Sequence, residues 1–332
     1  MGDNNLIFVG TFASSKALND FIIFNGFLAV ENGKITRIGS TVEYETKKRE
    51  GAFTNFKIVK LNEDQFIVPG FVDCHTHAPQ FPNIGLGLDR PLLEWLAKYT
   101  FPLESRYGDT EFASKVYDIV VKRLLNNGTT TACYFGSLHL NGTMELAKSV
   151  LRHHQRALVG KVSMNLKNDA GYYNETAKEL AEVETFVKNI LDYKNDLLQP
   201  VITPRFAISC DKQLMTGLAD ISETYNCRIQ SHISENQSEI ENVLQMFPEC
   251  KSYTDIYDKS RILNNRCIMA HAIYLSEEET RTLASKGVSI AHCPSSNTRL
   301  KSGLCHVRKY IDNQLVVGLG TGISFKLSLL IK

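Results

Sequence analysis

The chain has 332 residues, with 37 Lys and Arg against 36 Asp and Glu and a formal net charge of +1. Its 43% hydrophobic and 22% charged residues are typical of a globular protein and exclude gross disorder. No basic run exceeds Lys47-Lys48-Arg49, which argues against a nucleic-acid partner, and we interpret that cluster as a solvated loop. No apolar stretch approaches the roughly 18 residues of a membrane span.

The cysteine pattern and the N-terminal residues indicate in which cellular compartment the protein is expected. Eight cysteines are scattered along the chain without a C-x-x-C pair, which argues against a disulfide framework and a cysteine zinc site. The first residues lack the basic start and apolar block of a secretory signal. We therefore expect a cytoplasmic protein with reduced thiols.

Residues 1–68 are expected to form a small N-terminal β domain. The Asn32-Gly33 dipeptide lies between two apolar runs and predicts a tight hairpin. We expect an antiparallel sheet that forms a β-sandwich portion ahead of the main domain. Its predicted strands lie near 8–11, 24–31, 35–38 and 56–61.

Residues 69–332 form the second predicted domain, in which short apolar strands alternate with amphipathic helices. Eight such strands favour a (β/α)₈ barrel of the TIM type over an open doubly wound sheet. The strands are expected near 66–73, 128–136, 156–164, 199–209, 227–233, 266–273, 287–293 and 315–320. The helices are expected near 109–127, 141–155, 174–194, 212–225, 236–247, 276–286 and 302–313.

Histidines stand at the ends of several predicted strands. His75 and His77 are two residues apart, so both imidazoles project to one face of the first barrel strand and suit a Zn²⁺ ion. Taken alone, such a pair is more often two ordinary polar residues at a strand end. His232 and His271 belong to the fifth and sixth strands, and the C-terminal ends of barrel strands meet at one mouth. This convergence predicts a metal site.

Glu235 follows His232 by three residues, just beyond the strand end. A carboxyl group there can stand above a metal without binding it and can shuttle protons to and from an activated water. Alone, Glu235 would be interpreted as an acid near a helix N-terminus. His292, at the end of the seventh strand, is expected in the site wall and not as a ligand.

These residues resemble the amidohydrolase superfamily. The resemblance rests on Pro69-Gly-Phe-Val-Asp73 before the His-x-His pair, on the histidines of strands five and six, and on Gly318-Leu-Gly-Thr321. Within that superfamily the chain resembles the guanine deaminases. The supporting segments are His77-Ala-Pro-Gln80, Pro91-Leu-Leu-Glu-Trp-Leu-Ala-Lys-Tyr-Thr-Phe-Pro102, Asn127-Gly-Thr-Thr-Thr-Ala-Cys-Tyr-Phe135, Thr203-Pro-Arg-Phe206 and Gln230-Ser-His-Ile-Ser-Glu-Asn236.

The resemblance implies a zinc-dependent hydrolysis of guanine to xanthine and ammonia. It assigns His75, His77 and His232 as zinc ligands, with His232 also facing the substrate. A zinc-activated water would attack C2 of the purine, Glu235 would carry protons, and His271 would assist.

The resemblance also implies which side chains hold the purine: Gln80, Arg205 and Phe206. The Arg205 guanidinium can fork onto O6 and N7 of guanine, and the Gln80 amide suits the opposite edge. Phe206 or Trp95 can stack on the ring. Without the resemblance, Arg205 would be interpreted as a structural ion-pair residue and Phe206 as core.

The pattern breaks at position 322. The family places an aspartate there that binds zinc and acts as the base, whereas this chain has Gly322, and residues 323–332 do not resemble the family. We interpret this as a truncated or frame-changed C-terminal part that leaves the last barrel unit incomplete. Weak or no turnover and reduced stability are expected.

Two alternatives stay open at this point. One is an amidohydrolase for another nitrogen heterocycle, such as a cytosine- or triazine-like ring. The other is a catalytically impaired relative that acts only as a binding or interaction protein, for which Gly322 is the main support. Neither a nucleic acid nor a membrane is an expected partner, and the resemblance suggests a homodimer.

Overall fold

A computed structural model of the protein describes residues 5–322. The polypeptide divides into two compact units, one ending at Gly70 and the other beginning at Phe71, and each is described by itself. Within the described range, no helix has both the length and the apolar character needed to cross a bilayer.

The first unit is a five-stranded sheet with the order β3-β2-β1-β4 and with β5 also paired to β1. Asn32 and Gly33 have φ values of 51° and 75°, so the predicted hairpin between β2 and β3 is confirmed. The sheet is not purely antiparallel as predicted, because β4 and β5 run parallel to β1. The strands are β1 (Leu6–Ala17), β2 (Asp20–Glu31), β3 (Lys34–Ser40), β4 (Lys57–Lys60) and β5 (Phe66–Ile67).

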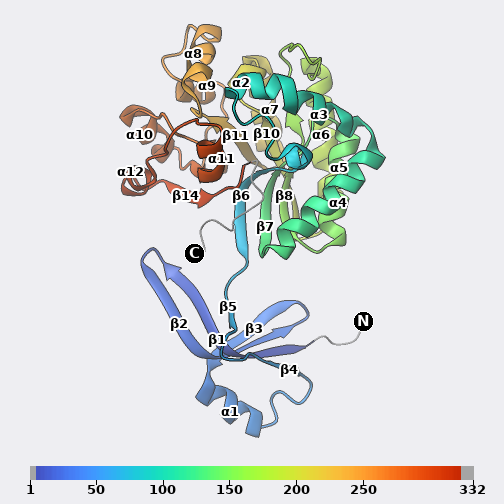
Figure 1. The fold of residues 1–332 in the computed structure, drawn as a ribbon, viewed down its shortest axis with the longest axis vertical. Helices are drawn as coiled ribbons and strands as arrows, with labels where there is room; N and C mark the ends of the chain where they lie inside the picture. Colours follow the sequence, from blue (N-terminus) through green and yellow to red (C-terminus); the bar gives the residue numbers. More distant parts are fainter. Residues whose placement is uncertain (1–4, 323–332) are drawn as a thin grey trace. The chain divides into compact units, whose positions relative to one another are not determined.

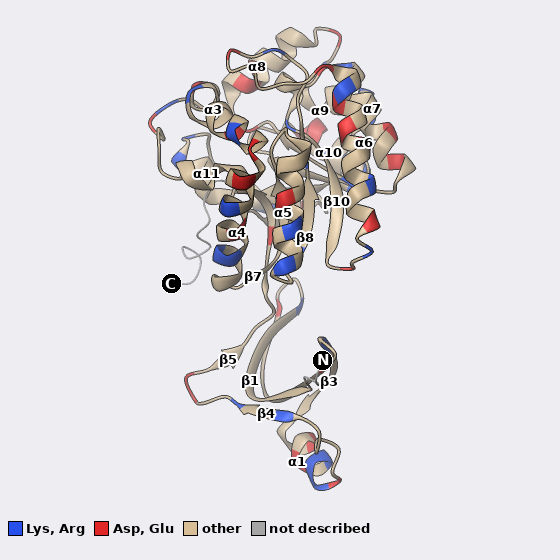
Figure 2. Ribbon diagram, turned by 90° about the vertical axis from the view of Figure 1, so that its right-hand side faces the viewer, with Lys and Arg blue, Asp and Glu red and all other residues tan. Residues whose placement is uncertain are grey.

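A helix that the sequence analysis missed, α1 (Thr41–Arg49), follows β3. It begins with a capping box in which the Ser40 side chain accepts from the Glu43 backbone N–H and Glu43 accepts from the Ser40 backbone N–H. The Lys47-Lys48-Arg49 cluster lies in its last turn, where cations interact favourably with the helix dipole (Figure 2). The interpretation of this cluster as a loop was wrong.

The second unit is a parallel barrel, as predicted (Figure 1). Its strand order is β6-β7-β8-β10-β11-β12-β13-β14, and the short β9 (Val162–Ser163) adds to β10. The first strand begins at Phe71, later than predicted, because Phe66–Ile67 pairs with β1 in the first unit. The strands are β6 (Phe71–His77), β7 (Thr129–Phe135), β8 (Arg156–Gly160), β10 (Leu198–Pro204), β11 (Arg228–Ile233), β12 (Cys267–His271), β13 (Ser289–His292) and β14 (Val316–Leu319).

Helices surround these strands, and Figure 2 shows α4 and α5 side by side, each carrying residues of both charges. The predicted helices are present within a few residues of their expected bounds. The short helices α9 and α11 were not predicted, and neither were the helical segments between β6 and α4. Buried side chains between helices and strands make the main hydrophobic core. The helices are α4 (Thr110–Asn126), α5 (Leu140–Arg152), α6 (Thr176–Asp192), α7 (Lys212–Thr224), α8 (Gln237–Met246), α9 (Tyr253–Lys259), α10 (Glu277–Ser285), α11 (Pro294–Arg299) and α12 (Val307–Asp312).

The barrel closes between β6 and the residues that follow β14. A parallel bridge joins Thr76 to Gly322. The Gly322 N–H donates to the His75 carbonyl oxygen at 2.9 Å, and the His77 N–H donates to the Gly322 carbonyl oxygen at 3.0 Å. Thr321 adds a hydroxyl hydrogen bond of 2.6 Å to the buried Asp73 carboxylate. The closing contacts therefore lie directly beside the predicted metal ligands.

Between β6 and α4 the chain makes a long helical excursion, η1 (Ala78–Asn83), α2 (Leu92–Trp95), η2 (Leu96–Thr100), α3 (Phe101–Ser105) and η3 (Arg106–Gly108). Residues 92–105 form one continuous helical run with a wide π turn over η2. The wide turn precedes Pro102, which has no N–H for a regular helical hydrogen bond. This excursion supplies Gln80, Leu92, Trp95 and Leu96 to the cavity at the barrel mouth.

Candidate active site

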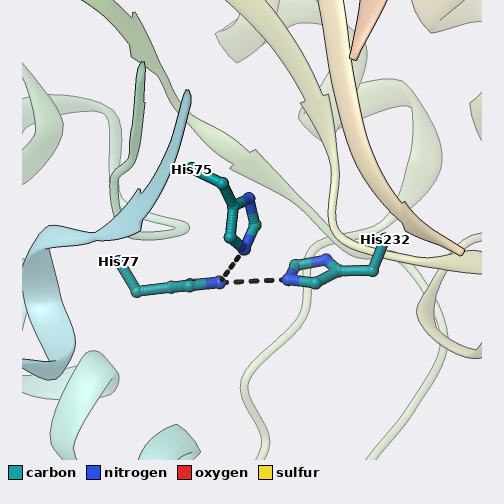
Figure 3. Close-up of side chains that lie close together, drawn as sticks. All are labelled: His75, His77 and His232. Carbon is teal, nitrogen blue, oxygen red and sulfur yellow. Dashed lines mark hydrogen bonds between the residues drawn. The ribbon is translucent and has the colours of Figure 1, made fainter. Parts of the chain in front are cut away.

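Three imidazoles meet at the mouth of the barrel (Figure 3). His75 and His77 come from β6, and His232 comes from β11. The Nε2 atom of His77 lies 3.1 Å from that of His75 and 3.0 Å from that of His232. All three side chains are buried. Period-two alternation along β6 explains why the first two imidazoles share a face.

These three nitrogens fit a divalent metal ion. His232 Nδ1 donates to the Arg205 carbonyl oxygen at 2.6 Å, which leaves its Nε2 lone pair free for a ligand bond. Burial, and then repulsion from neighbouring cationic groups, lowers the pKa of all three imidazoles well below its ordinary value. Nitrogen ligands bound to one tetrahedral zinc ion at about 2.0–2.1 Å lie about 3.3 Å from one another. The Nε2–Nε2 distances of 3.0 and 3.1 Å are close to that value.

His271 and Glu235 lie beside this group. The His271 ring stacks on the His232 ring at 5.4 Å between centroids and lies 5.5 Å from that of His75. The structure thus brings all four strand-end imidazoles together. His271 Nδ1 pairs with Asn297 Oδ1 at 2.7 Å, which leaves Nε2 facing Glu235 Oε2 at 3.5 Å. Burial lowers the pKa of His271 to about 4 and raises that of Glu235 to about 8.

The loop that carries Glu235 is anchored by a second buried acid, Glu239, which the sequence analysis did not single out. Glu239 Oε2 accepts from the backbone N–H groups of Glu235 at 3.0 Å and Asn236 at 3.2 Å. Its Oε1 accepts from the Tyr253 hydroxyl at 2.8 Å. These bonds hold the turn after β11, where Ser234 has a φ of 49°. Glu239, and not Glu235, is the acid of the first turn of α8.

A cavity opens over the imidazoles, with polar side chains on one wall and apolar side chains on the other. It brings together every predicted substrate-contacting side chain. Its polar wall comprises His77, Gln80, Arg205, His232, Glu235 and His271. Its apolar wall comprises Leu92, Trp95, Leu96, Phe206 and Leu300, and Ser296 and Gly322 complete it. His292, expected in the wall, is not among the described lining residues.

A carboxylate that the sequence analysis missed lies behind the polar wall. Glu104, from α3, binds the Arg205 guanidinium through both oxygens, at 2.7 and 3.1 Å. Its Oε1 also accepts from Gln80 Nε2 at 3.0 Å. Gln80 and Arg205 are therefore neighbours on one carboxylate. That they hold opposite edges of a ligand stays a prediction. A single acid inside a helical segment gives no motif that could have revealed this.

Comparison with known proteins places this site in a family. The model of the amidohydrolase family matches residues 66–324. The chain belongs to the amidohydrolase family. It is 44% identical to a guanine deaminase of Rattus norvegicus, over 96% of this chain and 71% of that protein. It is 35% identical to a guanine deaminase of Escherichia coli K12, over 91% of this chain and 67% of that protein.

A solved structure supports the same grouping. A crystal structure of guanine deaminase from C. acetobutylicum, with guanine bound in its active site, superposes with a TM-score of 0.91 at 35% identity. The match covers 97% of this chain and 75% of that chain. The predicted resemblance to the guanine deaminases is therefore confirmed, and the three-histidine group is consistent with the metal dependence typical of amidohydrolases.

Position 322 of this amidohydrolase lines the cavity without a side chain. Gly322 has a φ of 61°, a conformation that side chains other than Asn and Asp rarely adopt. A Cβ atom there would lie 2.8 Å from Ser296 Cβ and 3.2 Å from Ser296 Oγ. The backbone is thus placed where the family's aspartate is expected, but the neighbouring Ser296 crowds that position. The prediction that the last barrel unit is incomplete concerns residues 323–332, which lie outside the described residues.

The raised pKa of Glu235 predicts a pH dependence of stability in the metal-free protein. Its ordinary pKa is 4.5 and its folded pKa is about 8, because of burial. Between these values the folded state holds a proton that the unfolded state has lost. The free energy of unfolding should therefore fall as the pH rises, and the loss is complete above the folded pKa.

Urea midpoints measured with a chelator between pH 7.5 and 9 would test this, because that window lies well above the ordinary histidine pKa of 6.5, so the buried histidines contribute little to the slope there. Glu235→Gln should flatten the decline relative to the natural sequence. Parallel curves for the two proteins would contradict the prediction.

Proposed function

We infer that the chain is a zinc-dependent hydrolase that converts guanine to xanthine and ammonia. The observation that carries this proposal is one cavity lined by a metal-type histidine group, a buried acid and the Gln80–Arg205 pair. The similarity to guanine deaminases and the guanine bound in the C. acetobutylicum structure support it.

His75, His77 and His232 would hold the zinc ion, which when bound supplies a water molecule of lowered pKa. The protein's own part is to place and move protons beside it. Burial raises the pKa of Glu235 to about 8 in the absence of a metal ion, so its carboxyl group can hold a proton near neutral pH and deliver it to a ring nitrogen. The neutral His271 presents Nε2 toward Glu235 Oε2 and can accept or return a proton there.

The shape and polarity of the cavity favour a purine. Trp95, Phe206 and Leu300 supply apolar surface for a flat ring. Arg205 offers N–H donors that match the oxygen at C6, and Gln80 lies beside it. A cytosine- or triazine-like ring would leave part of this wall without a partner, which argues against the alternative heterocycles.

A second candidate function is binding without efficient turnover. Gly322 favours it, because no carboxylate at that position can take the proton of the attacking water. The two functions share one site and differ in rate. A cytoplasmic location and a homodimer stay predictions, and sedimentation of the purified protein would test the second.

The proposal is tested by incubating the zinc-loaded protein with guanine and following xanthine by absorbance and ammonia by a coupled assay. We expect slow but measurable conversion of guanine and none of cytosine or a triazine. Preferred turnover of a pyrimidine or triazine would overturn the proposed substrate. If guanine binds but no ammonia is released, the chain is a binding protein and not an efficient hydrolase.

A further inference from the structure

Glu104 is a fully buried carboxylate that stands one layer behind the cavity. It makes three charge-assisted hydrogen bonds to the polar wall, two from the Arg205 guanidinium and one from the Gln80 amide. Burial alone would lower the pKa of Arg205, but Glu104 raises it above its ordinary value. Arg205 therefore keeps its positive charge in this buried position.

The bond to Glu104 fixes which end of the Gln80 amide faces the ligand. An amide oxygen turned toward the carboxylate would be repelled, so Nε2 must donate to Glu104 Oε1. Gln80 Oε1 is then a buried acceptor without a partner among the described residues. Because Gln80 lines the cavity, a ligand is the natural source of the missing donor.

The same carboxylate fixes Arg205. Its two terminal nitrogens are held in a fork, and the guanidinium lies 5.0 Å from the centre of the Phe101 ring. A guanidinium has five N–H groups, and Glu104 engages two of them. The wall thus presents N–H donors from Arg205 next to the Gln80 acceptor. Glu104 Oε1 accepts a hydrogen bond from each of these two side chains and so fixes their relative position.

We propose that Glu104 is the specificity-determining positioning residue of this site. It imposes a donor–acceptor pair that selects neutral heterocycles carrying a carbonyl oxygen beside a ring N–H, as guanine and hypoxanthine do. Adenine presents an amine beside a bare ring nitrogen, the reverse pattern, and is rejected. This inference rests on the proposed function, since it takes a purine to be the ligand.

Binding can be measured by a signal that does not depend on turnover, because Trp95 is the only tryptophan of the chain and lines the cavity. Guanine, hypoxanthine and adenine are titrated against Trp95 fluorescence in the zinc-loaded protein. The natural protein should bind guanine and hypoxanthine at least about tenfold more tightly than adenine. Glu104→Gln should weaken guanine about tenfold or more and reduce the guanine-to-adenine ratio toward one.

Glu179→Gln is the matched control. Glu179 pairs with Lys161 at 2.6 Å, both side chains are fully buried, and neither lines the cavity. Losing that pair should affect stability and leave the affinity ratio unchanged. The ratio is the decisive readout, because a general loosening of the fold would weaken all three ligands alike.

A second variant keeps the test decisive if Glu104→Gln does not fold. Gln80→Leu preserves the Glu104–Arg205 pair, removes the acceptor, and should also reduce the guanine-to-adenine ratio. An unchanged ratio in Glu104→Gln or in Gln80→Leu would overturn the inference and leave the proposed function intact. Failure of the natural protein to bind any of the three purines would overturn the proposed function, and the inference with it.

Discussion

Replacing His77 with alanine should leave the purified protein without bound zinc. Its Nε2 atom lies 3.1 Å from that of His75 and 3.0 Å from that of His232, and its removal leaves two imidazoles, which are too few ligands for a tight site. We expect metal analysis to fall from about one zinc per chain to near zero. Guanine turnover should be lost with it.

Thermal melting provides a second measure of the same variant. A ligand present at about 1,000 times its Kd stabilises the folded state by about 4 kcal/mol, and each kcal/mol shifts the Tm by roughly 2–4 °C. A chelator should thus lower the Tm of the natural protein by roughly 10 °C and leave that of His77→Ala unchanged. His153→Ala is the control, because that half-buried imidazole pairs with Asp118 away from the cavity. Full zinc content in His77→Ala would refute the assigned site.

Gly322→Asp should raise guanine turnover by about 100-fold or more, since a well-placed general base contributes about 10²–10⁴ in rate. The backbone there already lies beside His75 and His77 and has the φ of 61° that aspartate tolerates better than most residues. The close approach of Ser296 opposes the gain. Adding Ser296→Gly, which removes the crowded Cβ, should therefore increase the rate further.

Gly322→Ala separates the carboxylate from the added bulk. It introduces the same Cβ contact with Ser296 at a positive φ, so it should lower stability by about 1–2 kcal/mol without any gain in rate. The rates are compared at equal zinc content, with xanthine formation as the measure. Equal rates for the aspartate variant and the natural protein would show that a missing base at 322 does not limit turnover.

The barrel and the imidazole group were predictable because their signals are local or periodic. Alternating apolar runs and amphipathic segments gave eight strands in the right order, and period-two geometry placed His75 and His77 on one face. His232 and His271 followed from their places at strand ends. The helix α1 was not predicted because it contains few apolar residues and therefore shows no amphipathic pattern. The Ser40–Glu43 capping box is the one sequence feature that indicates its start.

The rest depended on contacts that a sequence pattern does not encode. Glu104 pairs with a residue 101 positions away, and nothing in a helical segment marks which acid will be buried. The closure of the barrel through Gly322 and the side-by-side placement of Gln80 and Arg205 are likewise long-range results of packing. The sequence therefore predicted which residues form the site but not how they contact one another.

The excursion between β6 and α4 allows ligand selectivity to change independently of metal binding. It supplies Gln80, Trp95 and Glu104, whereas the imidazoles stand on the barrel strands themselves. Mutations within residues 78–108 can retune which base is admitted while the hydrolytic apparatus keeps its rigid support. Diversification of ligand range among relatives of this chain is thus expected to concentrate in this one stretch.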